Sequence, residues 1–360
     1  MEVIRRFALR RPGNADVTLV SPDRYTPYSG MLPGFIAGHY RFEECHIDLE
    51  PLCARAGMRF RRAEARELRA ETGSVRCSDG SEFGYDLLSL DTGSTPDVHS
   101  IAGALQHGIR VKPVNELLDA WKQIGAELRR GRSLCLAVVG GGAGGVELAA
   151  ALHYRWKAEA WTGAMRLSVL TETESLLPAH PARVQRIFQR AFRNRGIELR
   201  LNARVTHISP GQLKCADGTS MIADHTILAT GASAPAWLAE GGLNVDDRGF
   251  VAVDDSLRSL SHPNVFAAGD IAAMISNPRP KTGVYAVRQG PILAENLGRQ
   301  LRGDPLCRYL PQKTALALIS TGGKHAVASW SGIAFEGDWV WRWKDHVDRR
   351  FMATYRARTT

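Results

Sequence analysis

The chain has 360 residues, of which 44% are hydrophobic and 23% charged, a composition typical of a globular protein with two domains or three small ones. Its net charge of +9 at pH 7 suits nucleic acid, anionic lipid or anionic cofactors, but no nucleic-acid-binding motif supports the first. The six cysteines lack C-x-x-C or zinc-ligand spacing, and the first residues lack the apolar segment of a signal peptide. We therefore expect no metal site and a cytoplasmic location.

The first third of the chain has the pattern of a doubly wound nucleotide-binding unit. Strands are predicted at residues 16–23 and 57–62. A hairpin follows at 75–94, because Asp79-Gly80 is a favoured two-residue turn between alternating runs, and this hairpin unit closes on Thr92-Gly93.

Residues 134–152, LCLAVVGGGAGGVELAAAL, contain the most informative motif. Gly140, Gly142 and Gly145 form a G-x-G-x-x-G between an apolar strand and a helix. The first glycine permits the tight turn, the second lets the backbone approach a pyrophosphate, and the third lets helix and strand pack closely. The helix N-terminus adds free N–H groups and a partial positive charge. We therefore predict a dinucleotide site here; a glycine-rich loop in an ordinary α/β core is the alternative.

The second unit repeats the first. The segment LKCADGTSMIADHTILATGA at 213–232 matches VRCSDGSEFGYDLLSLDTGS at 75–94, so that Thr230-Gly231 corresponds to Thr92-Gly93. Extending the alignment places the glycine loop of the first unit before Met1. We therefore expect the first unit to lack one central strand and its loop, either because the true start lies upstream, which we favour, or because this copy is damaged.

Two later segments complete the pattern. NVFAAGDIAAM at 264–274 is a short strand that runs into Ala-Gly-Asp, and PKTGVYAVRQGPILAENL at 280–297 is a loop that opens a helix. The whole resembles the FAD-dependent pyridine nucleotide-disulfide oxidoreductases. The resemblance implies a glutathione-reductase-like α/β fold with two Rossmann-like domains, in which the NAD(P)H domain is inserted into the FAD domain. The implied boundaries are 1–110 and 234–305 for the two FAD halves, 111–233 for the NAD(P)H domain, and 306–360 for a small C-terminal segment.

The resemblance also implies site residues. The family Asp of A-x-G-D binds the flavin ribitol, which carries over to Asp270 after Gly269, and a helix N-terminus faces the flavin pyrimidine. The implied FAD residues are Ser21, Arg24, Thr92, Gly93, Gly269, Asp270, Lys281 and Thr282, and the residues implied near the flavin ring are Tyr28, Lys281 and Tyr285. The implied NAD(P) residues are Gly140, Gly142, Gly145, Glu147, Glu172, Thr230 and Gly231. No acid, base or nucleophile is demanded by this chemistry, because the cofactor carries it.

The departures from the family narrow the function. Residues 24–40 contain no C-x-x-x-x-C, so we expect no redox disulfide, and the remaining pattern is similar to the type II NADH dehydrogenase branch. PYSGMLPG, RPKTGVYAVRQGP and WKDHVDRRFM resemble flavoproteins that are fused to, or encoded beside, selenide,water dikinase. We therefore predict an FAD-dependent NAD(P)H oxidoreductase whose acceptor is a quinone or a selenium or sulfur compound. The alternative is a flavin-binding partner of selenide,water dikinase with little or no turnover.

Two further expectations concern selectivity and surface. Thr171 and Glu172 end the second strand of the NAD(P)H unit with no arginine close behind, which weakly favours NADH over NADPH. The tail WVWRWKDHVDRRFMATYRAR at 339–358 contains a predicted helix with Trp343, Val347, Phe351 and Tyr355 at i, i+4 spacing beside arginines that include Arg358. This helix either contacts the membrane surface peripherally, at its inner face, or packs on the FAD domain or across a homodimer.

Overall fold

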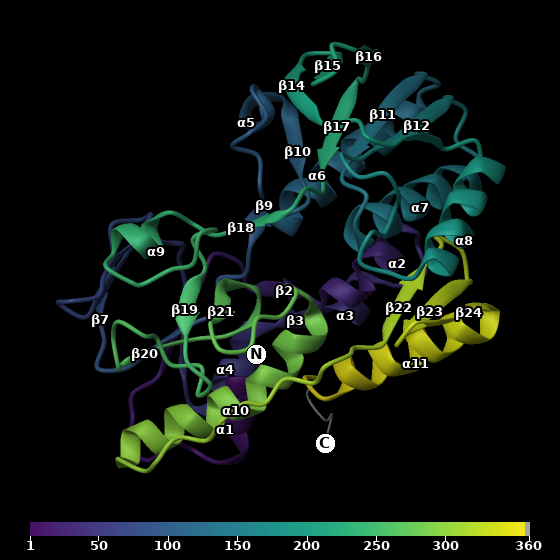
Figure 1. Ribbon diagram of the computed structural model, residues 1–360. Helices are drawn as coiled ribbons and strands as arrows, with labels where there is room; N and C mark the ends of the chain where they lie inside the picture. The colour runs from purple at the N-terminus through teal and green to yellow at the C-terminus, as the bar shows by residue number, and fades with distance from the viewer. Residues whose placement is uncertain (357–360) are drawn as a thin grey trace.

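A computed structural model describes residues 1–356, which form two sheet-containing units and a C-terminal unit beside them (Figure 1). The helices are α1 (Glu2–Leu9), α2 (Leu32–Ile36), α3 (Phe42–Cys45), α4 (Leu49–Ala56), α5 (Ala104–His107), α6 (Val114–Arg129), α7 (Ala143–Ala158), α8 (Ala182–Asn194), α9 (Trp237–Glu240), α10 (Gly283–Arg302) and α11 (Asp338–Ala353), with 3-10 turns η1 (Ser29–Met31) and η2 (Gly269–Ile271). The strands up to the NAD(P)H unit are β1 (Thr18–Ser21), β2 (Tyr25–Pro27), β3 (His46–Asp48), β4 (Arg59–Arg62), β5 (Ala65–Arg69), β6 (Ser74–Cys77), β7 (Glu82–Gly84), β8 (Leu88–Leu90) and β9 (Thr95–Pro96). The remaining strands are β10 (Gly108–Arg110), β11 (Leu134–Val139), β12 (Met165–Leu170), β13 (Glu198–Arg200), β14 (Val205–Ser209), β15 (Gln212–Cys215), β16 (Ser220–Ile222), β17 (His225–Leu228), β18 (Ala232–Ser233), β19 (Val251–Val253), β20 (Val265–Ala267), β21 (Ala272–Met274), β22 (Ala317–Ser320), β23 (Ala326–Trp330) and β24 (Ile333–Gly337).

The FAD unit is discontinuous in sequence, as predicted. Strand β8 pairs in parallel with β20, far along the chain, and β1 pairs in parallel with β4. Within residues 1–356, no ladder joins β1 to β8, so these strands form two separate parallel pairs. Helix α1 packs against α4 and α10 through its buried face, which includes Ile4 and Phe7.

The NAD(P)H unit is a five-stranded parallel sheet in the order β10-β17-β11-β12-β13. Strand β11 is almost entirely buried because α6, α7 and α8 pack on one face of the sheet and the β14-β15-β16 sheet packs on the other, which explains its continuous apolar run. Strand β10 lies at one edge, paired with β17. The expected boundary at 110/111 is therefore wrong: it would separate β10 from its own sheet, and Val98, Ile101 and Ala104 already belong to a core of this unit.

The predicted internal repeat is present in three dimensions. Strands β5-β6-β7 and β14-β15-β16 form two antiparallel three-stranded sheets of the same connectivity. Each carries a register irregularity at the same place in its first strand, between Ala65 and Glu67 in one and between Val205 and His207 in the other. A shared irregularity of this kind supports a common architecture for the two units.

The C-terminal unit is an antiparallel sheet, β22-β23-β24, followed by α11, which packs on that sheet and contacts α3. Helix α11 begins at Asp338, so Trp339, Trp341 and Trp343 all belong to it. The four side chains predicted at i, i+4 spacing do not share one environment. Trp343 and Val347 are exposed, whereas Phe351 and Tyr355 pack toward the FAD unit. Arg358 lies outside the described residues.

Candidate functional site

The glycine loop between β11 and α7 has a distinct geometric role for each motif glycine. A Cβ on Gly140, which has φ +134°, would lie 2.1 Å from the Ala229 carbonyl oxygen, and a Cβ on Gly145 would lie 2.1 Å from the Gly140 carbonyl oxygen. Both positions are therefore closed to any side chain by backbone. Gly142 is different: it has ordinary φ and ψ of −74° and 176°, it is exposed, and a Cβ there would meet no protein atom within 4 Å.

Helix α7 leaves its first N–H groups free at this point. Gly142 is its N-cap residue, no side chain caps the helix, and the first turn contains no acidic residue. Unpaired helix amides beside an open glycine form an anion site suited to a diphosphate. The residues present therefore fit the dinucleotide that the motif predicts.

Three other predicted NAD(P) positions surround this loop. The Thr230 hydroxyl donates to the Asp97 carbonyl oxygen at 2.7 Å, and the Asp97 N–H donates to the Gly231 carbonyl oxygen at 2.6 Å. Two segments of the chain run between the FAD unit and the NAD(P)H unit, and they pair through β9 and β18. Thr230-Gly231 thus links these two connecting segments beside that pairing. Glu172 is exposed just beyond β12, whereas Thr171 is buried and bonded to Thr173.

Glu147 lies on α7 at the contact with the C-terminal unit. Its Oε1 accepts the Ser320 N–H at 2.7 Å, and burial raises the pKa of the carboxyl group to about 7. Lys344 and the Ser320 N–H oppose that increase in the pKa, and Asp348 adds to it. Glu147 is therefore a carboxyl group poised to titrate near neutral pH.

Lys344 forms a buried ion pair next to this carboxyl group. Its Nζ donates to Asp348 Oδ2 and to the Gly30 carbonyl oxygen, both at 2.6 Å. Tyr28 packs against Phe351 in a tilted arrangement with 4.4 Å between ring centroids, and burial together with Asp348 raises the pKa of Tyr28. The segment around Tyr28 is thereby fixed to α11, an arrangement that the sequence did not indicate.

On the FAD side, Asp270 follows β20 and η2 begins at Gly269. Asp270 Oδ2 accepts from Lys112 Nζ at 2.9 Å and from the Ser94 hydroxyl at 3.2 Å, while Gln289 Oε1 accepts the Gly269 N–H at 2.7 Å. Lys112 and Ser94 were not among the predicted site residues. Lys112 belongs to no motif, and only contacts between distant segments bring it here.

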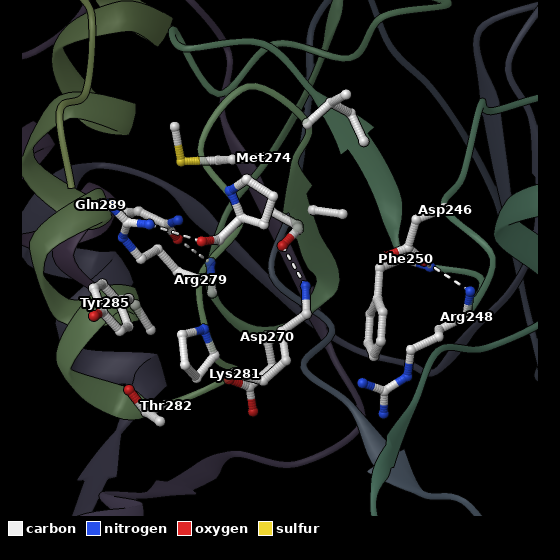
Figure 2. A pocket seen from close by; sticks show the side chains of 17 residues that line it. Asp246, Arg248, Phe250, Asp270, Met274, Arg279, Lys281, Thr282, Tyr285 and Gln289 are labelled. Atoms are coloured by element: carbon white, nitrogen blue, oxygen red, sulfur yellow. Dashed lines mark hydrogen bonds between the residues drawn. The ribbon is translucent and has the colours of Figure 1, made fainter. Parts of the chain in front are cut away.

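A cavity of about 300 Å³ opens beside Asp270, between the segment that joins α9 to β19 and the N-terminal half of α10. Figure 2 shows Tyr285 and Gln289 on the α10 side, with Phe250 and Arg248 opposite. Lys281 lines it too, with Nζ 4.0 Å from the Phe250 ring centroid and hydrogen bonded to the Ala272 carbonyl oxygen, and burial lowers the pKa of its amino group. Thr282, the N-cap residue of α10, lines the cavity as well.

The remaining predicted FAD residues differ in their availability. Thr92 is exposed, and a Cβ on Gly93 would meet no atom within 4 Å, so both are open to a ligand. The Ser21 hydroxyl donates to the Asp23 carbonyl oxygen at 3.0 Å. The Arg24 guanidinium is occupied by carboxylates, at 2.7 Å from Asp48 and 2.8 Å from Glu50. The structure thus gives Arg24 other partners than a cofactor.

All six cysteines are present as free thiols. Cys45 and Cys53, the two in the first FAD half upstream of the hairpin, are buried, and burial raises the pKa of each thiol. A raised pKa keeps a thiol protonated and unreactive. Packing is therefore the role that the structure gives to these two cysteines.

Two dinucleotide-type folds, one with an open glycine loop and one with the Asp270 cradle, define a two-nucleotide oxidoreductase. Residues 5–290 match the pyridine nucleotide-disulphide oxidoreductase family, and the chain belongs to that family. It is thus an FAD-dependent NAD(P)H oxidoreductase.

Named relatives agree with this class. The chain is 26% identical over 349 residues to the NADH-dependent phenylglyoxylate dehydrogenase subunit epsilon of Aromatoleum evansii, covering 95% of this chain and 79% of that protein. It is 26% identical over 299 residues to a demethylphylloquinone reductase of Synechocystis, covering 79% and 72%. The fold superposes with a TM-score of 0.79 on the sulfide:quinone oxidoreductase of Aquifex aeolicus, at 19% identity and over 98% and 89% of the two chains. In residues 1–356, no helix combines the length and apolar character needed to cross a membrane.

Proposed function

We propose that this protein oxidises NADH and passes the electrons through FAD to a quinone or to a selenium or sulfur compound, without a redox disulfide. The open Gly142 at the free N-terminus of α7 is the observation that carries the proposal, because it provides a diphosphate site in the NAD(P)H unit. When bound, FAD accepts a hydride from nicotinamide and releases electrons to a second acceptor. The protein contributes the two nucleotide sites, at the glycine loop before α7 and around Asp270, and the charged side chains of those sites.

The preference for NADH is supported by the end of β12. Glu172 is exposed and can accept hydrogen bonds from a ribose 2′-hydroxyl, whereas its charge would repel a 2′-phosphate. The Arg200 guanidinium, on the neighbouring strand, is 2.8 Å from Glu198 and so already neutralised. Comparing the rates of flavin reduction by NADH and NADPH tests this preference.

The proposal is tested by the absorbance spectrum of the purified protein. We expect a flavin spectrum that bleaches on anaerobic addition of NADH and recovers on addition of the physiological class of acceptor. Quinones, selenium compounds, sulfur compounds and oxygen, added separately to the NADH-reduced protein, identify that class by the rate of recovery. A protein that takes up no flavin would refute the proposal, and one whose bound flavin NADH does not bleach would favour the flavin-binding partner of selenide,water dikinase.

We also propose that the protein is cytoplasmic and contacts the membrane surface through its C-terminal unit. The exposed apolar side chains of β23, β24 and α11 form one group, Trp330, Ile333, Phe335, Trp339, Trp343 and Val347. Trp339 and Trp343 stack with 6.5 Å between centroids, and the exposed Arg342 and Arg350 lie on the same helix. Aromatic and cationic side chains together favour the interface of an anionic bilayer.

Replacing Trp339 and Trp343 with serine should reduce co-sedimentation with vesicles of phosphatidylcholine and phosphatidylglycerol by roughly tenfold or more, because each indole loses interfacial burial. Serine at Trp237, a tryptophan of the FAD unit outside this group, is the control. Wild-type protein that ignores the vesicles but forms dimers that the double variant loses would assign the surface to a homodimer instead.

A further inference from the structure

Two carboxylates meet at the edge of the FAD unit. Strands β8 and β20 pair in parallel with Leu90 opposite Ala267, so their carboxyl ends lie at the same edge. Asp91 follows β8 directly and Asp270 follows β20. The two strand ends approach each other closely at Gly269, because a Cβ there would lie 2.6 Å from Asp91 Oδ1.

Asp91 lies beside Gly269, and its side chain is accessible to solvent although many protein atoms surround it. This surrounding protein, together with Asp270, raises the pKa of Asp91 to about 6, and the α-amino group of Met1 and Lys112 oppose that increase. Two carboxyl groups therefore share this edge.

Lys112 pairs with Asp270 and also lies close enough to Asp91 to oppose the increase in the pKa of that carboxyl group. Its Nζ is 2.9 Å from Asp270 Oδ2 and 3.2 Å from the Ser94 hydroxyl, and Ser94 is buried. Lys112 comes from the segment between β10 and α6, so it reaches the FAD edge from the entrance of the NAD(P)H unit. Lys281, whose pKa is also influenced by Asp270, is directed to the Ala272 carbonyl oxygen instead.

FAD presents two chemical demands at this edge. Its ribityl hydroxyls donate hydrogen bonds to carboxylates, whereas its diphosphate is repelled by uncompensated carboxylates. We infer that Lys112 is a positioning residue for FAD: it neutralises one of the two charges of Asp91 and Asp270 and so lets both carboxyl groups remain beside an anionic cofactor. This inference rests on the proposed function, since it assumes that the cleft holds FAD.

The inference predicts a specific pattern of rescue. Lys112→Met should raise the dissociation constant of FAD by at least about tenfold, because Asp270 then faces the diphosphate without its paired cation and beside Asp91. Adding Asp91→Asn to that variant should return the constant to within about threefold of wild type, because the excess charge is removed while an amide oxygen still accepts from a hydroxyl. Lys112→Arg should retain affinity, and Lys122→Met, at an exposed lysine of α6, is the matched control.

The measurement is fluorescence quenching of FAD titrated with the full chain of each variant, with a thermal melt to establish folding. Wild-type protein that takes up no FAD would refute the proposed function. A Lys112→Met protein that binds FAD as wild type does, or a loss of affinity that Asp91→Asn fails to reverse in folded protein, would overturn only the role of Lys112. The role of Lys112 would also be overturned if Lys112→Met fails to fold and Lys112→Arg folds but loses affinity for FAD.

Discussion

Replacing Gly142 with valine is expected to abolish flavin reduction by NADH while leaving bound FAD in place. The conformation at Gly142, φ −74° and ψ 176°, is one that valine adopts readily, and a Cβ would meet no protein atom within 4 Å. Valine is a poorer N-cap than glycine, but that costs only about 1 kcal/mol. Its isopropyl group would project into the space where a diphosphate approaches the free amides of α7.

We expect the rate of flavin reduction at a fixed NADH concentration to fall at least about a hundredfold, equivalent to roughly 2.7 kcal/mol of lost nucleotide binding. Stopped-flow absorbance gives the rate, and the flavin spectrum of the purified variant gives the FAD content. If flavin and NADH reduction are lost together in folded protein, this loop does not serve the nicotinamide nucleotide.

Gly145→Val provides the contrast within the same motif. A Cβ at Gly145 would lie 2.1 Å from the Gly140 carbonyl oxygen, so this substitution forces backbone apart and should lower the midpoint of thermal unfolding. Gly142→Val should melt close to wild type. The pair separates ligand exclusion from structural damage at two positions three residues apart.

The NAD(P)H unit was the part most readily predicted from sequence. Its strand, glycine loop and helix are contiguous, and Gly140 and Gly145 are explained by contacts within one turn or with the adjacent strand, whereas Gly142 faces open space. The hairpins were predictable for the same reason, since an Asp-Gly turn is a local signal. Assigning β10 failed because its pairing with β17 joins residues more than a hundred positions apart.

At the FAD edge, the sequence predicted one partner of the ion pair and not the other. Asp270 was found through A-x-G-D, but its partner Lys112 carries no local signal and meets it only through the fold. Asp91 did carry a signal, because it directly precedes Thr92-Gly93 and so had to lie at the carboxyl end of β8. Arg24 was chosen for its position, and a sequence alone could not reveal that Asp48 and Glu50 already pair with it.

The raised pKa of Glu147 leads to a prediction about stability. Its carboxyl group titrates near pH 7 when folded, against about 4.5 when unfolded, so the unfolded chain loses this proton first as the pH rises. The stabilising contribution of the protonated Glu147 carboxyl group to the free energy of unfolding is therefore fully present below about pH 4.5 and is lost as the pH rises through 7. The loss amounts to roughly 1–3 kcal/mol, reduced from the full linkage value because the side chain is partly accessible.

Glu147→Gln should consequently unfold at a higher denaturant concentration than wild type at pH 8 and at nearly the same concentration at pH 5. The amide Oε1 still accepts the Ser320 N–H, so the hydrogen bond seen at 2.7 Å survives while the buried negative charge does not. Urea unfolding at both pH values measures the difference, and Glu71→Gln, at an exposed glutamate in a turn, is the control. A Glu147→Gln variant that gains no stability at pH 8 would show that the carboxyl group is ionised at little cost in the folded protein.

The pH profile of flavin reduction then separates a structural role for Glu147 from one near the nicotinamide. A carboxyl group that faces the nicotinamide changes its charge near pH 7, and wild-type flavin reduction by NADH should show a step there that Glu147→Gln lacks. If the variant gains stability at pH 8 but keeps the wild-type pH profile, Glu147 serves the contact between α7 and the C-terminal unit and takes no part in hydride transfer.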